Sequence, residues 1–273
     1  MIARLGEGLS QSGTLNLEAR QRTINILSNY QKAIAKHSIA AEQTRVIATA
    51  GLRKATNSQD FLNEVNQHLG FNIEIIDGDR EAHLNFVAVS RGLQLPPSIP
   101  LLIMDIGGGS TEIITTAGGK IATAKSLHLG SVWLTEHHFK LQDPPSQTAY
   151  QKAEAEIRSL LRQANFLWPI NSAMIGIAGT VTTLCAMNQK MTIYDPRKVH
   201  GATLTLESIL KIEKILLQIP LAEKIKLPGL QKERADVLLA GAMIARIVMQ
   251  EAKIEKLTVS DQGIRYGLLW EYV

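Results

Sequence analysis

Cysteine, aromatic residues and long hydrophobic runs are scarce in this sequence of 273 residues, and each scarcity excludes a class of protein. Cys185 is the single cysteine, so the sequence contains neither an internal disulfide nor a cluster of thiolate metal ligands. Aromatic residues make up 5% of the sequence, too few for the stacking platforms that hold nucleic-acid bases. No run of Lys and Arg resembles a nucleic-acid-binding arm. We therefore expect no nucleic-acid partner.

Membrane segments are missing as well. The longest apolar stretch, Val237 to Met249, is interrupted by Arg246 and is shorter than the ~20 residues needed to cross a bilayer. The opening segment, MIARLGEGLS, lacks the apolar core of a signal peptide. These absences predict a soluble, cytoplasmic protein with no membrane partner. The formal net charge of +4 suits an anionic substrate without identifying one.

The composition, with 45% hydrophobic and 20% charged residues, is that of an ordinary globular protein. Apolar periodicity and chain-breaking residues predict helices that alternate with short strands, which is typical of an α/β fold. The predicted helices cover 17–37, 60–69, 79–93, 148–164, 207–217, 232–251 and 264–272, and a further helix opens near Gly179. The predicted strands cover 44–49, 72–76, 173–177 and 256–260, with further strands on both sides of Gly107–Gly109 and a hairpin turn at AGGK, 117–120.

The segment LQLPPSIP, 93–100, is the best candidate for a linker, because its prolines cannot continue a helix. We therefore predict a first domain at residues 1–97 and a second at 98–273. The last helix is able to pack back on the first domain.

The most informative motif is Met104-Asp105-Ile106-Gly107-Gly108-Gly109-Ser110-Thr111-Glu112, in which two strands flank three glycines. Glycines let a phosphate approach the backbone closely, and converging N–H groups form a nest for anions. Asp105 and Glu112 supply hard oxygen ligands for Mg²⁺ or could orient a water. The alternative is a glycine-rich hairpin tip with two surface carboxylates. The dinucleotide fingerprint does not fit, because the turn leads into a strand.

A similar motif follows the predicted strand 173–177, in the segment IAGTVTT that contains Gly179 and Thr180. A strand that meets a helix N-terminus presents N–H groups and the positive end of the helix dipole, which favour an anion. The alternative is a helix that Thr180 merely caps.

Glu81 is the third candidate, in the first turn of a helix that Asp79 can cap. The apolar face of this helix includes Ala82 and Phe86, and a carboxylate at the border of that face could act as a general base for water. The alternative is that Glu81 only complements the helix dipole.

Together these segments resemble the exopolyphosphatase and guanosine pentaphosphate phosphohydrolase (Ppx/GppA) family. The resemblance extends over essentially the whole chain and follows the order of the family's motifs. It includes the segments ATAGLRKATNSQDFL, IEIIDGDREAHLNFVAVSRGL, MDIGGGSTEI, AGTVTTL, YDPRKVHGATLT, ERADVLLAGAMI and VSDQGIRYGLL. The resemblance implies an α/β fold of two domains of the actin-like, ribonuclease-H-like ATPase type, with the substrate in an interdomain cleft.

Residue roles also follow from the resemblance. Glu81 matches the family's catalytic base toward water, and Asp105 and Glu112 match carboxylates that bind a divalent cation, Mg²⁺ or another. The phosphate-binding loops match Gly107, Gly108, Gly109, Ser110, Gly179 and Thr180, and further substrate contacts match Arg53, Asn57 and Arg265. The implied substrates are polyphosphate or guanosine pentaphosphate, and a homodimer is one assembly compatible with the resemblance.

Two features depart from the family pattern. The segment ARLGEGL normally follows a strand-turn-strand unit that carries another phosphate loop, and nothing here matches that unit. We therefore expect Met1 to be an internal methionine of a longer protein; the alternative is a truncated, impaired product. Arg80 stands where the family usually has a second acid beside the catalytic glutamate.

The expected reaction is hydrolysis of a terminal phosphoanhydride by a water that Glu81 activates. One alternative within the same superfold is a phosphotransferase or ATPase, which would need an adenosine pocket. Another is a protein that binds polyphosphate or the guanosine alarmone without turnover. The sequence does not separate polyphosphate from guanosine pentaphosphate as substrate, because the two share the bond that is broken.

Overall fold

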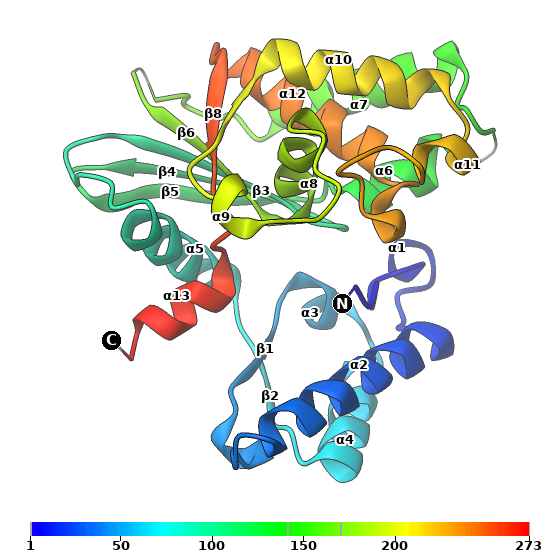
Figure 1. Ribbon diagram of the computed structural model, residues 1–273, viewed down its shortest axis with the longest axis vertical. Helices are drawn as coiled ribbons and strands as arrows, with labels where there is room; N and C mark the ends of the chain where they lie inside the picture. Colours follow the sequence, from blue (N-terminus) through cyan, green and yellow to red (C-terminus); the bar gives the residue numbers. More distant parts are fainter. Residues whose placement is uncertain (1, 141, 170, 273) are drawn as a thin grey trace. The chain divides into compact units, whose positions relative to one another are not determined.

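The computed structural model describes residues 2–140, 142–169 and 171–272 (Figure 1). The chain forms two compact units, Met1–Glu81 and Ala82–Val273. The division between them falls inside helix α5, Gly78–Gly92, and so precedes the predicted linker at 93–100. A domain boundary after residue 97 stays a prediction.

The first unit is built around a small parallel sheet. Strand β1, Val46–Ala48, pairs with β2, Ile73–Ile75, and helices α2, Leu17–Ala35, and α4, Ser58–Leu69, supply most of the helical residues. Its short helical segments are α1, Leu9–Ser12, η1, Ala41–Gln43, and α3, Ala50–Lys54. The buried core contains Leu15, Leu52, Phe61, Val65, Leu69 and Phe71.

The second unit contains a mixed sheet with the strand order β5-β4-β3-β6-β8-β7. The strands are β3, Leu101–Ile106, β4, Thr111–Ala117, β5, Lys120–Leu127, β6, Ala173–Ile177, β7, Thr203–Thr205, and β8, Lys256–Val259. Strands β3, β6 and β8 run parallel to one another, whereas β4 is antiparallel to β3. The carboxyl ends of the three parallel strands therefore meet at one edge of the sheet.

Helices cover both faces of this sheet (Figure 1). One face packs against the larger helical layer, which includes α6, Ser131–His138, α7, Gln147–Gln163, α8, Ala178–Asn188, α10, Leu206–Gln218, and α12, Leu238–Glu251. The short segments α9, Pro196–Val199, α11, Leu221–Lys224, and η2, Lys232–Arg234, connect these helices. The opposite face packs against α5, whose Ala82 and Val89 contact the cluster formed by Ile103, Ile114 and Ile175.

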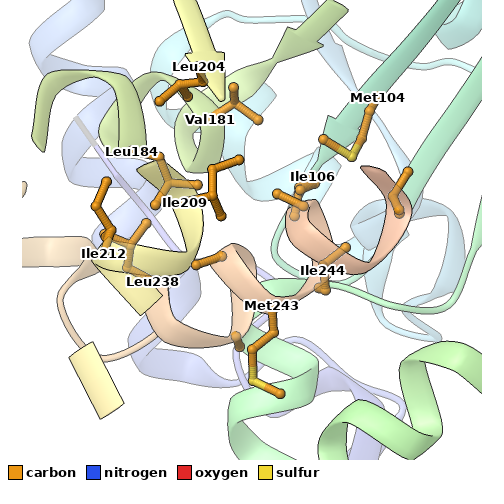
Figure 2. Close-up of a cluster of buried hydrophobic side chains, with 14 of the residues drawn as sticks. Met104, Ile106, Val181, Leu184, Leu204, Ile209, Ile212, Leu238, Met243 and Ile244 are labelled. Carbon is orange, nitrogen blue, oxygen red and sulfur yellow. The ribbon is translucent and has the colours of Figure 1, made fainter. Parts of the chain in front are cut away.

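Strand β3 shows why this layering forms. Leu102, Met104 and Ile106 belong to the cluster on the larger helical layer, whereas Leu101 and Ile103 belong to the cluster on the α5 side. Side chains along a strand alternate between the two faces of the sheet, so Asp105 lies on the α5 side. Figure 2 shows Met104 and Ile106 in the larger cluster with Val181, Leu184 and Met243.

The last helix, α13, Ile264–Trp270, packs on α5. A Cβ added to Gly267 would lie 2.1 Å from the carbonyl oxygen of Leu84, so only glycine allows this close approach. Arg91 adds a hydrogen bond of 3.0 Å to the carbonyl oxygen of Trp270.

No described helix is long and apolar enough to cross a membrane.

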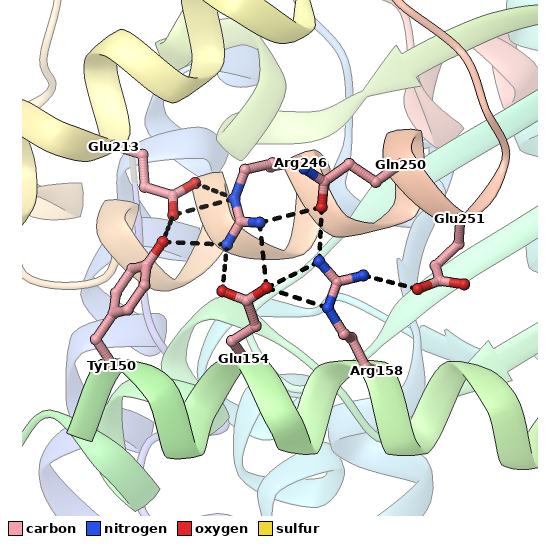
Figure 3. Close-up of polar contacts among 7 residues, drawn as sticks. All are labelled: Tyr150, Glu154, Arg158, Glu213, Arg246, Gln250 and Glu251. Atoms are coloured by element: carbon pink, nitrogen blue, oxygen red, sulfur yellow. Dashed lines mark hydrogen bonds and ion pairs between the residues drawn. The ribbon is translucent and has the colours of Figure 1, made fainter. Parts of the chain in front are cut away.

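A buried ionic network joins α7, α10 and α12 (Figure 3). The Arg246 side chain is 5% exposed and donates to Glu213 Oε2 at 2.9 Å and to Glu154 Oε2 at 3.1 Å. The Tyr150 hydroxyl donates to Glu213 Oε1 and accepts from Arg246 Nη2. Burial alone would raise the pKa of Glu154, but hydrogen bonds from Arg246 and Arg158 outweigh it and lower that pKa. Each buried charge therefore has a partner, as burial of charges requires.

Most of the predicted elements are confirmed, and the differences are shifted element ends and short elements that the sequence pattern does not predict. The AGGK hairpin forms with Gly118 and Gly119 at positive φ, as predicted. The predicted helix 232–251 begins only at Leu238, because 232–234 form a 3₁₀ turn instead. Helices α3 and α6 and the short strand β7 were not predicted.

The network in Figure 3 predicts a large cost for removing its central cation. Arg246→Met should lower the free energy of unfolding in urea by about 3–5 kcal/mol, because the Glu213 side chain, 3% exposed, would remain buried without a counter-charge. Arg158→Met is the matched control, because the Arg158 side chain is 28% exposed, and it should cost about 1 kcal/mol or less. Equal losses in the two variants would contradict this account.

Candidate functional site

The turn between β3 and β4 places two carboxylates opposite each other. Asp105 and Glu112 are directly paired in the antiparallel register of these strands, so their side chains are neighbours on one face of the sheet. The Gly107 N–H donates to the Ser110 carbonyl at 2.9 Å and closes the turn. The predicted motif thus forms a single hairpin that holds both acids and the glycine loop 107–110.

The N-terminus of helix α6 is hydrogen-bonded to the glycine loop. The Ser131 N–H donates to the Gly107 carbonyl at 2.9 Å, and the N–H groups of Val132 and Trp133 donate to the Gly108 carbonyl at 2.9 and 3.0 Å. The helix N-terminus thereby satisfies some of its own unpaired donors and fixes the direction of two loop carbonyls. A Cβ added to Gly130, just before α6, would lie 2.2 Å from the Gly108 carbonyl oxygen.

The glycine loop also contains backbone donors that no described residue accepts. Within the described residues, no hydrogen bond uses the backbone N–H groups of Gly108, Gly109 or Ser110. Gly108 and Gly109 are exposed, and none of the three glycines has a positive φ. Close packing accounts for two of them, since a Cβ on Gly107 would lie 3.1 Å from the Ser110 carbonyl oxygen and one on Gly108 would lie 3.2 Å from Val132 Cγ2. Adjacent unpaired N–H groups in a loop of this kind suit an anion.

Side-chain donors from neighbouring elements bind both carboxylates of the hairpin. Asn85 Nδ2 on α5 donates to Asp105 Oδ2 at 3.0 Å, and Ser126 Oγ on β5 donates to Glu112 Oε1 at 2.7 Å. Among the described residues no group of three or more His, Cys, Asp or Glu could hold a metal. Two carboxylates beside an anion site nevertheless fit Mg²⁺, which usually binds one or two carboxylates and completes its shell with waters and phosphate oxygens.

The second loop joins β6 to α8 beside the first. Thr180 Oγ1 donates to the carbonyl oxygen of Ile106 at 3.2 Å, so its hydroxyl ties the start of α8 to the end of β3. The helix begins at Ala178, whose φ is +66°, and it has no side-chain cap, so the alternative in which Thr180 caps it is wrong. A Cβ added to Gly179 would lie 2.0 Å from Arg234 Nη2, which brings a guanidinium group against the helix N-terminus.

Glu81 is in the first unit, next to Arg53. Arg53 Nη1 and Nη2 each lie 3.2 Å from Glu81 Oε2, and Nη1 also donates to the carbonyl oxygen of Ile76. Glu81 is 7% exposed, so this carboxylate is buried beside a cation. The predicted cap Asp79 is wrong, because Asp77 Oδ1 accepts the Arg80 N–H at 2.7 Å and caps α5 instead.

Of the other two predicted substrate contacts, Asn57 is hydrogen-bonded within the first unit and Arg265 is exposed. Asn57 is engaged with the backbone of Leu15, accepting its N–H at 2.8 Å and donating to its carbonyl at 3.0 Å. These bonds use both polar groups of the amide to hold the chain near Leu15. Arg265 is the second residue of α13 and is exposed.

Sequence reasoning missed several residues that shape this site. Gly130, Asn85 and Ser126 each contact the hairpin, yet all three are distant from it in sequence. Arg234 belongs to a recognised motif, but nothing in its sequence context places it on Gly179. Pairings of this kind depend on tertiary packing and have no local signature.

Comparison with known proteins identifies relatives of the whole chain. The model of the Ppx/GppA phosphatase family matches residues 1–273. The chain is 32% identical to exopolyphosphatase 2 of Mycobacterium tuberculosis, over 98% of the chain and 86% of that protein. It is also 32% identical to the guanosine-5'-triphosphate,3'-diphosphate pyrophosphatase of Vibrio cholerae, where 99% of the chain matches 52% of that protein.

The chain spans less than half of another relative. It is 32% identical to the bifunctional 3-dehydroquinate synthase/phosphatase of Fusobacterium nucleatum, over 100% of the chain and 41% of that protein. Among solved structures, the Aquifex aeolicus member of the Ppx/GppA protein family superposes with a TM-score of 0.81 at 32% identity, covering 100% of this chain and 87% of that one. This likeness confirms the α/β, actin-like fold that the sequence predicts.

The contact between Gly130 and the glycine loop gives a sharp test of the site's construction. Gly130→Ala should lower the free energy of unfolding by about 1–3 kcal/mol, because the new methyl group would overlap the backbone of Gly108. Gly109→Ala is the matched control, since a Cβ there meets nothing within 4 Å, and it should change stability by about 0.5 kcal/mol or less. Urea denaturation of both variants provides the measurement, and similar effects would contradict the described packing.

Proposed function

The chain belongs to the Ppx/GppA phosphatase family, and from that premise we propose that it hydrolyses the terminal phosphoanhydride of inorganic polyphosphate or guanosine pentaphosphate. The named activities of two relatives, an exopolyphosphatase and a guanosine pentaphosphate pyrophosphatase, support this reaction. Both substrates end in the same bond. The proposal therefore defines the reaction and leaves the choice between the substrates to experiment.

One observation carries the proposal: the β3–β4 hairpin combines two opposed carboxylates with a loop of unused N–H groups. Asp105 and Glu112 are paired across the strands, and the N–H groups of Gly108, Gly109 and Ser110 are next to them in the chain. The hairpin is at the carboxyl edge of the parallel strands, where α/β sheets usually bind ligands. A terminal phosphate and its cation fit this combination of donors and acceptors.

Asp105 and Glu112 are the residues that would hold a divalent cation. Their oxygen ligands suit Mg²⁺ better than softer metals, and the hydrogen bonds from Asn85 and Ser126 limit their rotation. When bound, such a cation would neutralise negative charge on the phosphate oxygens. The glycine loop would bind other oxygens of the same phosphate through its backbone N–H groups.

Glu81 is proposed as the general base. It would accept a proton from a water whose oxygen attacks the terminal phosphorus as the bridging P–O bond breaks. The products are inorganic phosphate and a chain or nucleotide shorter by one phosphate, and the proton then passes to solvent. The two contacts from Arg53 at 3.2 Å would keep the Glu81 carboxylate in one orientation.

Arg234 and the start of α8 would contribute positive charge. The guanidinium group of Arg234 is packed against Gly179, at the positive end of the helix dipole. Fixed positive groups around a phosphate stabilise the charge that develops as the bond breaks. We therefore add Arg234 to the predicted phosphate-binding residues Gly179 and Thr180, and we assign the Thr180 hydroxyl to positioning because it already bonds Ile106.

The role of Glu81 can be tested by phosphate release from long-chain polyphosphate and from guanosine pentaphosphate in the presence of Mg²⁺. Glu81→Gln should lower the rate by about a hundredfold or more, because it removes the base but preserves the size of the side chain. Asp79→Asn is the matched control, since Asp79 is an exposed acid in the same helical turn, and its rate should equal that of the wild type.

The outcomes distinguish the alternatives. Wild-type rates in Glu81→Gln would remove Glu81 from the mechanism. Binding of polyphosphate without phosphate release by the wild type would favour a binding protein over an enzyme. Transfer of the terminal phosphate to an acceptor other than water, without release of inorganic phosphate, would favour a phosphotransferase of the same superfold.

A further inference from the structure

Asn85 is a buried polar residue on the apolar face of α5. It is 0% exposed, and its neighbours on that face, Ala82 and Val89, pack into the core of the second unit. Its Nδ2 donates to Asp105 Oδ2 at 3.0 Å. Its Oδ1 is also buried and has no hydrogen-bond partner among the described residues.

Stability alone does not favour asparagine at this position. A buried carbonyl oxygen without a donor is unfavourable, because it loses its hydrogen bonds to water and gains none in return. A leucine of similar size would suit the apolar surroundings and is a better helix former. A locally unfavourable residue inside a packed element often marks a functional constraint.

The NH₂ group of the Asn85 side chain is the part that makes a hydrogen bond, and it bonds Asp105. Asp105 is the last residue but one of the buried strand β3 and is itself only half-buried, so packing alone does not define the plane of its carboxylate. A donor at 3.0 Å from one oxygen selects one orientation of that plane. Ser126 does the same for Glu112, so each of the opposed carboxylates has its own side-chain donor.

We propose that Asn85 is a positioning residue that orients Asp105 for divalent-cation binding. The inference deepens the proposed function and rests on it for the role of Asp105.

The test compares Asn85→Leu with Ser90→Ala in the full chain. Ser90, also on α5, is the matched control, because its hydroxyl is buried and has no hydrogen-bond partner, in the hairpin or elsewhere, within the described part of the chain. Three quantities are measured for each protein: the Kd for Mn²⁺ from the paramagnetic resonance of free Mn²⁺, the Mg²⁺ concentration for half-maximal phosphate release, and the melting temperature. Asn85→Ala, which removes the amide without filling the space, is the second variant if Asn85→Leu does not fold.

We expect Asn85→Leu to raise the Kd for Mn²⁺ and the half-maximal Mg²⁺ concentration by about tenfold, as losses of such supporting bonds typically do. Its melting temperature should equal or exceed that of the wild type, and saturating Mg²⁺ should restore the rate. Ser90→Ala should leave both metal values unchanged. The combination of weaker metal binding with retained stability is the signature of positioning, because a purely structural role would lower stability.

An unchanged Kd for Mn²⁺ in Asn85→Leu would overturn the inference, whatever the rate of phosphate release. A wild type that binds no Mn²⁺ would overturn it as well. If the wild type binds Mn²⁺ more tightly than Asn85→Leu but releases no phosphate, the proposed hydrolase activity fails and the positioning role stands. The metal-binding measurement thus separates the failure of one proposal from the failure of the other.

Discussion

Burial of strand β3 on both faces is the constraint on which the second unit depends. Leu101 and Ile103 face the α5 side and Leu102, Met104 and Ile106 face the larger helical layer, so a shift of one residue would move every side chain to the wrong face. Asp105 is the one residue of β3 that is only half-buried. The hydrophobic register therefore determines which face carries this carboxylate, and the antiparallel pairing brings Glu112 beside it.

Contacts around the end of β3 also fix the conformation of the glycine loop that follows this strand. Its carbonyls are held by the N-terminus of α6, the Ile106 carbonyl is held by Thr180, and Gly130 leaves room for the backbone of Gly108. These contacts use carbonyl groups at the loop, and among the described residues no hydrogen bond uses the N–H groups of Gly108, Gly109 and Ser110. Donors that are fixed before the ligand arrives stabilise charge without reorganisation, which is what phosphoryl transfer requires.

Local patterns were sufficient to predict the elements that carry the site, but not the contacts between them. Glycine clusters between apolar strands correctly predicted the β3–β4 hairpin and the AGGK turn, because turn chemistry is local. The predicted start of the helix at 232 was wrong, because 232–234 form a 3₁₀ turn that periodicity does not distinguish from an α-helix. Asn85, Gly130 and the position of Arg234 on Gly179 depend on long-range packing. The predicted roles of Asn57 and Arg265 remain predictions.

The central claim is that the β3–β4 hairpin binds the phosphate and its cation. The most direct test is a crystal structure of the Glu81→Gln variant with tripolyphosphate and Mn²⁺, in which anomalous scattering locates the metal. The account predicts Mn²⁺ between Asp105 and Glu112, with the terminal phosphate hydrogen-bonded to the N–H groups of Gly108, Gly109 or Ser110. A metal or terminal phosphate bound away from this hairpin would contradict it.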